Sequence, residues 1–253
     1  MRHKSYNPDM SALSNSIRER YERTLERIAN AERRSGRAPG STRLVVVTKS
    51  QPREVIEAAI EAGGKILGEN YPEEAVGKVR SIPAPGVEWH MIGHVQSRKA
   101  DLIPANFRLM HSLDSLKLAQ RLDRFAAQAG VRLPVLLEFN VGEEESKFGW
   151  SAAEETRWPD LLPEIDMMLK LGNLEVRGLM TMPPFFDEPE PARPYFRKLR
   201  GLRDFLANSM PGVDWLELSM GTSSDFEAAV EEGATLVRVG TAIVGPRPPK
   251  VQE

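Results

Sequence analysis

Apolar residues near the start of the chain recur at the spacing of an α-helix. They lie among charged residues, at Leu13, Ile17, Tyr21, Leu25 and Ile28. One face of the segment is therefore apolar and the other is charged. The pattern predicts an amphipathic helix over residues 11–37, and the Gly and Pro residues at 36–40 end it.

Beyond residue 40 the pattern changes to short apolar runs rich in β-branched residues, which predict buried strands. These runs cover residues 43–48, 65–67, 87–92, 107–111, 134–140, 174–180, 215–218 and 235–239. Helical patterns fall between them, most clearly at residues 54–62, 115–129, 192–207 and 225–231. Two Pro-rich segments, 81–86 and 183–194, are expected to be surface linkers.

Alternating strands and helices indicate parallel strands with crossover helices, and eight such units close a barrel. The expected fold class is therefore α/β, a single (β/α)8 TIM-type barrel with an extra N-terminal helix. A doubly wound open sheet is the alternative. We predict three parts of the chain: a helical extension packed on the barrel at residues 1–40, the barrel at 41–246 and a short tail at 247–253.

Composition narrows the classes of function. The 253 residues carry a formal net charge of -2, which gives no sign of nucleic acid or an anionic membrane as a partner. The absence of cysteine excludes disulfides and thiolate chemistry, and no apolar run is long enough to span a bilayer. We expect a cytoplasmic monomer; a mitochondrial transit peptide is a weaker reading of the basic, Ser-containing N-terminus.

Polar residues gather where the predicted strands end, which is where barrels place their active sites. After the last two strands lie small and hydroxyl-bearing residues: Ser219, Gly221, Ser223, Gly240 and Thr241. Loops in these two positions often bind phosphate through backbone N–H groups and hydroxyls. The alternative is ordinary helix capping by Ser223 or Ser224 ahead of the helix at 225–231.

Lys49 ends the first predicted strand. A lysine there either reaches the surface along its alkyl stem or faces the barrel mouth. Opposite a phosphate site, it becomes a candidate for forming a Schiff base with an aldehyde. Arg238 lies inside the last strand, where it either contacts a ligand or forms a structural ion pair with Glu138 or Glu217.

Other polar residues at strand ends are less specific. His90 and His94 are four residues apart, but they belong to a strand interrupted by Gly93 and have no third ligand at metal spacing, so no metal site is expected. Asn70 and Asn140 either orient Lys49 or a ligand, or simply form turns.

The chain resembles the pyridoxal phosphate homeostasis protein family, single-domain relatives of the alanine racemase N-terminal barrel. The resemblance rests on segments that occur in family order: VVVTKS (45–50), GENYPEE (68–74), EWHMIGHVQSRK (88–99), HSLDS (111–115), FNVGEEESKFG (139–149), GLMTM (178–182), LSMGTSSDFEAAV (218–230) and VRVGTAIVG (237–245). It departs from the family at Pro72, Glu73 and Thr222.

This resemblance implies pyridoxal 5'-phosphate (PLP) as the cofactor, with Lys49 as its Schiff-base lysine and Arg238 facing the pyridine nitrogen. It implies that the phosphate is held by Ser219, Ser223, Gly240 and Thr241. Asn70, His90 and Met220 are placed in the same cofactor site.

For function, the resemblance implies a carrier that buffers or delivers PLP, with effects on amino-acid balance and with PLP-dependent apoenzymes as partners. Turnover is not expected, because alanine racemase needs a tyrosine from a second domain that has no counterpart here. A PLP enzyme such as a weak racemase is the alternative. A third reading, from the residues alone, is a phosphosugar or Schiff-base aldolase barrel without PLP.

Overall fold

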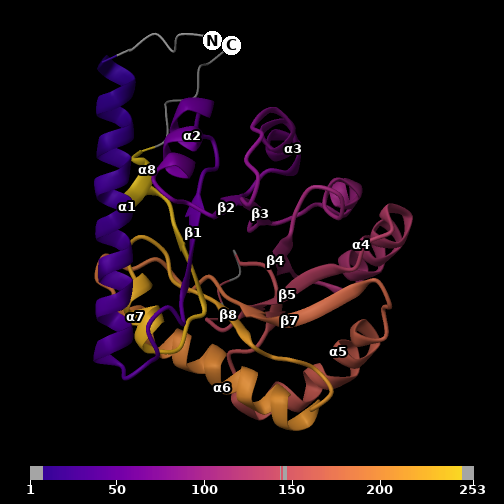
Figure 1. Ribbon diagram of the computed structural model, residues 1–253. Helices are drawn as coiled ribbons and strands as arrows, with labels where there is room; N and C mark the ends of the chain where they lie inside the picture. Colours follow the sequence, from indigo (N-terminus) through magenta and orange to yellow (C-terminus); the bar gives the residue numbers. More distant parts are fainter. Residues whose placement is uncertain (1–7, 143, 145–146, 247–253) are drawn as a thin grey trace.

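The computed structural model describes residues 8–142, 144 and 147–246. The first element, α1 (Pro8–Arg34), is the predicted amphipathic helix. It packs against α2 (Arg53–Glu61), α7 (Phe226–Glu231) and α8 (Thr241–Val244). It therefore contacts helices from the early and the late parts of the sequence (Figure 1). Ile17 and Ile28 are buried in this contact, and Arg27 forms an ion pair of 2.7 Å with Glu227.

Eight parallel strands form a closed barrel. They are β1 (Arg43–Val47), β2 (Ile66–Glu69), β3 (Glu88–Met91), β4 (Leu109–Leu113), β5 (Leu133–Asn140), β7 (Leu174–Met180), β8 (Glu217–Ser219) and β9 (Leu236–Val239). The ring closes because β4 pairs with β5 and β1 pairs with β9. The predicted barrel is confirmed, and the open-sheet alternative is wrong. A two-residue strand, β6 (Trp150–Ser151), pairs with the end of β5.

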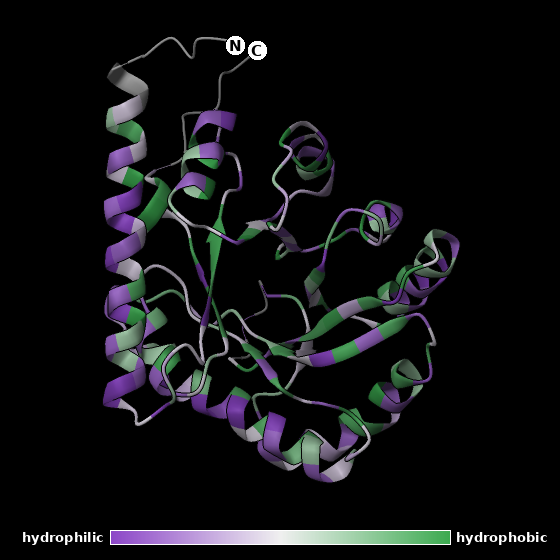
Figure 2. Cartoon of the chain, in the orientation of Figure 1, coloured by the Kyte–Doolittle hydropathy of each residue, from purple (hydrophilic) through white to green (hydrophobic). Residues whose placement is uncertain are grey.

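The strands are buried on both faces, which explains why they read as continuous apolar runs. Inside the barrel lies a small cluster of side chains: Val45, Ile66, Leu109, Leu136, Met180 and Leu236. A larger core separates the strands from the helices. Figure 2 shows the resulting division, with hydrophobic strands in green and hydrophilic positions in purple along the outer helices.

Between the strands lie α3 (Pro72–Ser81), α4 (Leu116–Ala129), α5 (Leu162–Leu169) and α6 (Arg193–Ser209), with 3-10 turns at η1 (Ser97–Leu102), η2 (Glu155–Leu161) and η3 (Glu190–Ala192). The expected linker at 81–86 is irregular apart from its first residue, which ends α3. The linker at 183–194 is irregular only to 189, because η3 and α6 occupy the rest. The predicted tail lies outside the described residues. In the described part of the chain, no helix is long and apolar enough to cross a membrane.

Candidate functional site

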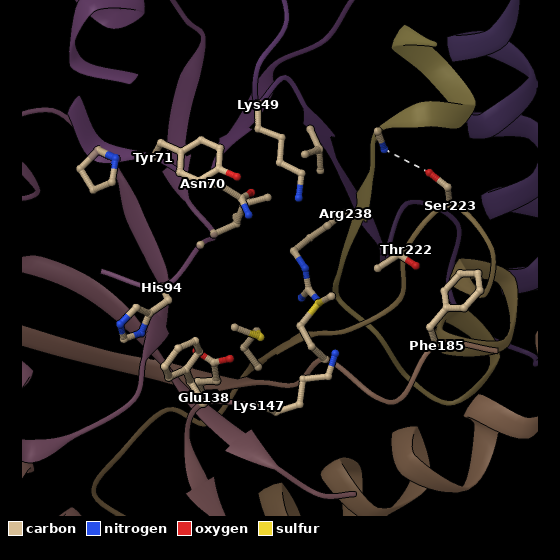
Figure 3. Close-up of a pocket in the computed structure, with 18 of the residues that line it drawn as sticks. Lys49, Asn70, Tyr71, His94, Glu138, Lys147, Phe185, Thr222, Ser223 and Arg238 are labelled. Carbon is tan, nitrogen blue, oxygen red and sulfur yellow. Dashed lines mark hydrogen bonds between the residues drawn. The ribbon is translucent and has the colours of Figure 1, made fainter. Parts of the chain in front are cut away.

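A pocket of about 810 Å³ opens at the carboxyl ends of the strands. Its lining comes from the last residues of seven of the eight barrel strands and from the loops that follow them. It includes Lys49, Asn70, Tyr71, His94, Glu138, Lys147, Phe148, Met182, Phe185, Ser223, Arg238, Gly240 and Thr241. Figure 3 shows the labelled side chains around this hollow, with Lys49 and Arg238 on one side and His94 and Glu138 across from them. The structure thus brings together six predicted site residues: Lys49, Asn70, Ser223, Arg238, Gly240 and Thr241.

Lys49 is held by the backbone on either side of it. Thr48 is fully buried, and its N–H donates a hydrogen bond of 3.0 Å to the carbonyl of Gly68 on the neighbouring strand. Ser50, which follows, has a φ of 57°, a left-handed conformation that is unusual for a residue with a Cβ. Its N–H donates to the Glu74 carboxylate at 3.0 Å. The Lys49 side chain points from this fixed turn into the pocket (Figure 3).

A buried charge network underlies this turn. The Lys78 ammonium donates hydrogen bonds of 2.9 Å to the carbonyl of Thr48 and to the carboxylate of Glu69, and it pairs with Glu74 at 2.6 Å. The hydroxyl of Thr48 also donates to Glu69, at 2.7 Å. Burial raises the pKa of the Glu69 carboxyl, while Lys78 and the Thr48 hydroxyl act in the opposite direction. The network therefore fixes the segment that carries Lys49.

Asn70 follows β2 and reaches the pocket with an unsatisfied acceptor. Its Oδ1 is buried and has no hydrogen-bond partner among the described residues. A Cβ on Gly93 would lie only 2.5 Å from the Asn70 carbonyl, so glycine is needed where β3 leaves the barrel beside this residue. A buried, unpaired amide oxygen at a pocket wall suits a ligand with a hydrogen-bond donor.

Glu138, near the end of β5, is a second acceptor of this kind. Its side chain is buried in the pocket wall, and Oε2 has no hydrogen-bond partner among the described residues. Burial and the nearby charge of Asp114 raise the pKa of Glu138 to about 7, against weaker opposing effects of Arg238 and Lys147. Near neutral pH this carboxyl can therefore either accept or donate a proton.

Arg238 carries a buried positive charge at the pocket wall. Its guanidinium donates to the hydroxyl of Ser219, to the carbonyl of Thr181 at 2.9 Å and to the sulfur of Met182 at 2.8 Å. Burial lowers the pKa of Arg238 to about 10, which leaves it protonated at neutral pH. All three acceptors are uncharged. Arg238 therefore differs from most buried arginines, which are paired with a carboxylate.

The predicted structural ion pair of Arg238 is wrong. Within the described residues, Arg238 makes no ion pair with Glu138 or Glu217, although the charge of Glu138 raises its pKa. Glu217 instead pairs with Arg43 at the opposite end of the barrel. The arginine is therefore left facing the pocket.

Ser223 joins the loops after β8 and β9. Its Oγ accepts hydrogen bonds from the N–H groups of Gly240, at 3.2 Å, and Ala242, at 3.5 Å. The predicted alternative, helix capping by Ser223 or Ser224, is wrong, because the cap residue of α7 is Asp225. Hydroxyls and N–H groups of two neighbouring loops thus meet at one corner of the pocket.

Three predicted site residues do not reach the pocket. His90 and Ser219 are buried in the barrel below it, and Met220 is buried in the larger core between the strands and the helices. Asn140, at the end of β5, also lies outside the lining; its amide donates to the Glu144 carbonyl at 2.8 Å, which is local loop chemistry. No group of metal-binding side chains occurs in the described ranges.

Sequence reasoning missed part of the pocket wall. His94 hydrogen-bonds Asp114 through Nδ1 at 2.7 Å and stacks on the ring of Phe148 at 3.7 Å between centroids. Tyr71, Phe148 and Phe185 expose 49%, 51% and 79% of their surface at the mouth. His94 was considered from the sequence only as a metal ligand, and the three aromatic residues could have been marked only by their apolar rings among polar loop residues.

Comparison with known proteins agrees with this geometry. The family described as "Alanine racemase, N-terminal domain" matches residues 25–248. The "Pyridoxal phosphate homeostasis protein" of Aquifex aeolicus is 42% identical over 90% of this chain and 97% of its own length. The protein of that name from Escherichia coli strain K12 is 35% identical over 92% and 97%.

Solved structures show the same likeness. A crystal structure described as that of an unknown protein from Bifidobacterium adolescentis superposes with a TM-score of 0.80 at 36% identity, covering 92% of this chain and 96% of its own. PipY of Synechococcus elongatus, solved with PLP bound, gives a TM-score of 0.73 at 34% identity, covering 87% and 99%. By fold, by family match and by identity over nearly its whole length, the chain belongs to the pyridoxal phosphate homeostasis protein family, built on the alanine racemase N-terminal domain.

Proposed function

We propose that this chain binds PLP in the pocket at the carboxyl end of the barrel, attaches it to Lys49 as a Schiff base, and holds it for delivery to other proteins. One observation carries the proposal: a lysine, a buried arginine and a cluster of hydroxyl and N–H groups line the same pocket. A planar ligand with an aldehyde, a ring nitrogen and a phosphate matches these three kinds of group.

The phosphate would be held at the corner formed by Ser223, Gly240 and Thr241. The N–H groups that now donate to Ser223 Oγ, together with the hydroxyls of Ser223 and Thr241, suit the oxygens of a dianion. The protonated Arg238 would face the pyridine nitrogen and, as a donor, keep that nitrogen unprotonated.

The opposite wall suits the remaining polar groups of the ligand. Asn70 Oδ1 and Glu138 Oε2 are the two buried acceptors of this pocket that lack partners among the described residues. A bound ligand that donates to them would give both buried acceptors a hydrogen-bond partner. When bound, PLP supplies an aldehyde that condenses with a primary amine and releases water, and Lys49 is the pocket lysine that is held on a fixed turn.

A carrier must also release its ligand, and the shape of the pocket supports this role. Tyr71, Phe148 and Phe185 are well exposed at the mouth, so water and the cofactor can pass. An enzyme active site typically excludes water when it reacts.

The test is to titrate the purified protein with PLP, follow the Schiff-base absorbance band, and then mix the loaded protein with a PLP-dependent apoenzyme. We expect one bound PLP, and recovery of the apoenzyme's activity faster than hydrolysis alone releases PLP. A parallel assay of proton exchange at Cα of alanine and other amino acids tests the racemase alternative. Exchange at about 1 s⁻¹ or faster, a common enzymatic rate, would favour that alternative.

A further inference from the structure

Four buried side chains cross the interior of the barrel in one line of hydrogen bonds. Arg238 donates to Ser219 Oγ; Ser219 Oγ lies 2.7 Å from His111 Nδ1; and His111 Nε2 lies 2.9 Å from His90 Nδ1. The line ends at Glu88, whose carboxylate lies 3.2 Å from His90 Nε2. Glu88 begins β3, so the line runs from the pocket to the opposite mouth of the barrel.

The chemistry at the two ends fixes the direction of every bond between them. A guanidinium only donates, so Ser219 Oγ accepts from Arg238 and its own proton points to His111 Nδ1. His111 then carries its proton on Nε2 and donates to His90 Nδ1. His90 likewise carries its proton on Nε2 and donates to the carboxylate of Glu88, which only accepts.

Both imidazoles are suited to this neutral arrangement. Burial lowers the pKa of His90 and lowers the pKa of His111 well below its ordinary value, and the charge of Arg238 acts in the same direction on His111. At the far end, the hydrogen bond from His90 lowers the pKa of the Glu88 carboxyl. Arg108 and Arg43 also lower the pKa of Glu88, and Arg43 is itself paired with Glu217.

We propose that His111 and His90 are positioning residues for Arg238: as neutral Nε2–H tautomers they form, with Ser219, a directed hydrogen-bond chain from the pocket guanidinium to Glu88. Each ring turns its lone pair toward Arg238 and its N–H toward Glu88. Bonds aligned in this way polarise one another, so the buried cation is stabilised without a carboxylate in direct contact. The chain also fixes the plane of the guanidinium at the pocket wall.

The first test needs no cofactor. The full chain contains four histidines, so ¹⁵N-labelled imidazoles give few signals by NMR. We expect His90 and His111 to show a protonated Nε2 and an unprotonated Nδ1 from about pH 5 to pH 8, the range in which an ordinary histidine changes charge. An imidazolium, or an Nδ1–H tautomer at either ring, would overturn the proposal.

The second test breaks the chain at each end. Ser219→Ala removes the donor to His111, and Ser112→Ala is the matched control, since Ser112 is equally buried but donates to the Gly93 carbonyl. Glu88→Ala removes the terminal acceptor, whereas Glu88→Gln keeps one. We expect shifted His111 nitrogen signals in Ser219→Ala and Glu88→Ala, and unchanged signals in Ser112→Ala and Glu88→Gln.

The link to the cofactor rests on the proposed function and has its own measurement. Ser219→Ala should weaken PLP binding about tenfold to hundredfold, the effect of losing a hydrogen bond to a charged group, while Ser112→Ala should not weaken it. If the wild-type chain does not bind PLP, the proposed function fails while the NMR result still decides the hydrogen-bond chain. If the tautomers are as expected but Ser219→Ala binds PLP normally, the positioning role is overturned. Because Glu88 is only partly buried, its two variants keep the test decisive even if Ser219→Ala does not fold.

Discussion

The Lys78 ammonium lies 2.9 Å from the carboxylate of Glu69, and both groups sit under the turn that presents Lys49 to the pocket. The Glu69 side chain is wholly buried and that of Lys78 is 13% exposed. The buried Glu69 carboxylate has Lys78 as its partner in an ion pair, whereas Lys78 also pairs with the partly exposed Glu74, so this network links the stability of the barrel to the geometry of its pocket.

Lys78→Met should therefore be strongly destabilising. Removing one partner of a buried pair leaves an uncompensated charge, which typically lowers the free energy of unfolding by about 3–5 kcal/mol. Urea denaturation measures the loss, and the double variant Lys78→Met/Glu69→Gln should recover much of it. Arg53→Ala, which breaks an exposed pair with Glu57, is the control and should cost less than about 1 kcal/mol. Equal losses in Lys78→Met and Arg53→Ala would contradict this account.

Lys49→Ala should abolish the visible absorbance band of the PLP-loaded protein and the adduct trapped by borohydride. Lys147→Ala is the matched control, because Lys147 lines the same pocket on another wall. Peptide mass spectrometry after reduction should place the added mass on Lys49. An adduct on Lys147 or Lys65 in the wild-type protein would show that the assignment is mistaken.

Ser223→Ala combined with Thr241→Ala should weaken PLP binding far more than pyridoxal binding, because pyridoxal lacks the phosphate. Each lost hydrogen bond to an ionised group corresponds to about 1.5–3 kcal/mol, or tenfold to hundredfold in affinity. Titrating both ligands against wild type and variant measures the difference. Ser224→Ala, a hydroxyl in the same loop, serves as the control. Equal weakening of the two ligands would move the phosphate elsewhere.

Glu138 gives the stability of the protein a predictable pH dependence. Its folded-state pKa of about 7 lies above the ordinary 4.5, so its protonated form is favoured in the native state. The free energy of unfolding therefore contains a contribution from the protonated Glu138 carboxyl. This contribution is fully present below pH 4.5 and is lost as the pH rises through 7. The substituted side chain in the variant Glu138→Gln stays neutral at every pH. Between pH 4.5 and 7 the free energy of unfolding of this variant should therefore rise relative to that of wild type, by up to about 3 kcal/mol.

Urea denaturation of both proteins at about pH 4.5 and about pH 8 measures the effect, since these values bracket the titration. The control is Glu57→Gln, because the Glu57 side chain on α2 is 41% exposed, whereas Glu138 is buried. A stability difference for Glu138→Gln that does not vary with pH would show that this carboxyl keeps an ordinary pKa.

The barrel was predictable because its strands are short, buried on both faces and rich in β-branched residues. All eight predicted strands overlap observed ones, and β7 matches at both ends. Helix α3 was not singled out, because its sequence PEEAVGKVRS has a proline at its first position and few apolar residues. Only the burial of Ala75 and Val76 in the folded chain reveals its inner face.

The site was predictable in position but not in depth. Residues at strand ends were expected to converge, and Lys49, Arg238 and Ser223 do line one pocket. Spacing alone could not show that Ser219 and Met220 are fully buried and lie outside the lining of the pocket. Nor could it place Glu138 in the wall, because the depth of a side chain depends on how the strands tilt and stagger when the barrel closes.

The pairing of β1 with β9 has a consequence for how the protein is made. Leu44 faces Val237 and Val46 faces Val239, so the first strand to leave the ribosome is paired on one side by the last. During synthesis, the free edge of β1 stays available to wrong partners, as unpaired strand edges generally are. Lys49 and Arg238 also come together only through this final pairing. A nascent chain therefore has no cofactor pocket, and the ability to hold PLP would mark molecules whose barrel has closed.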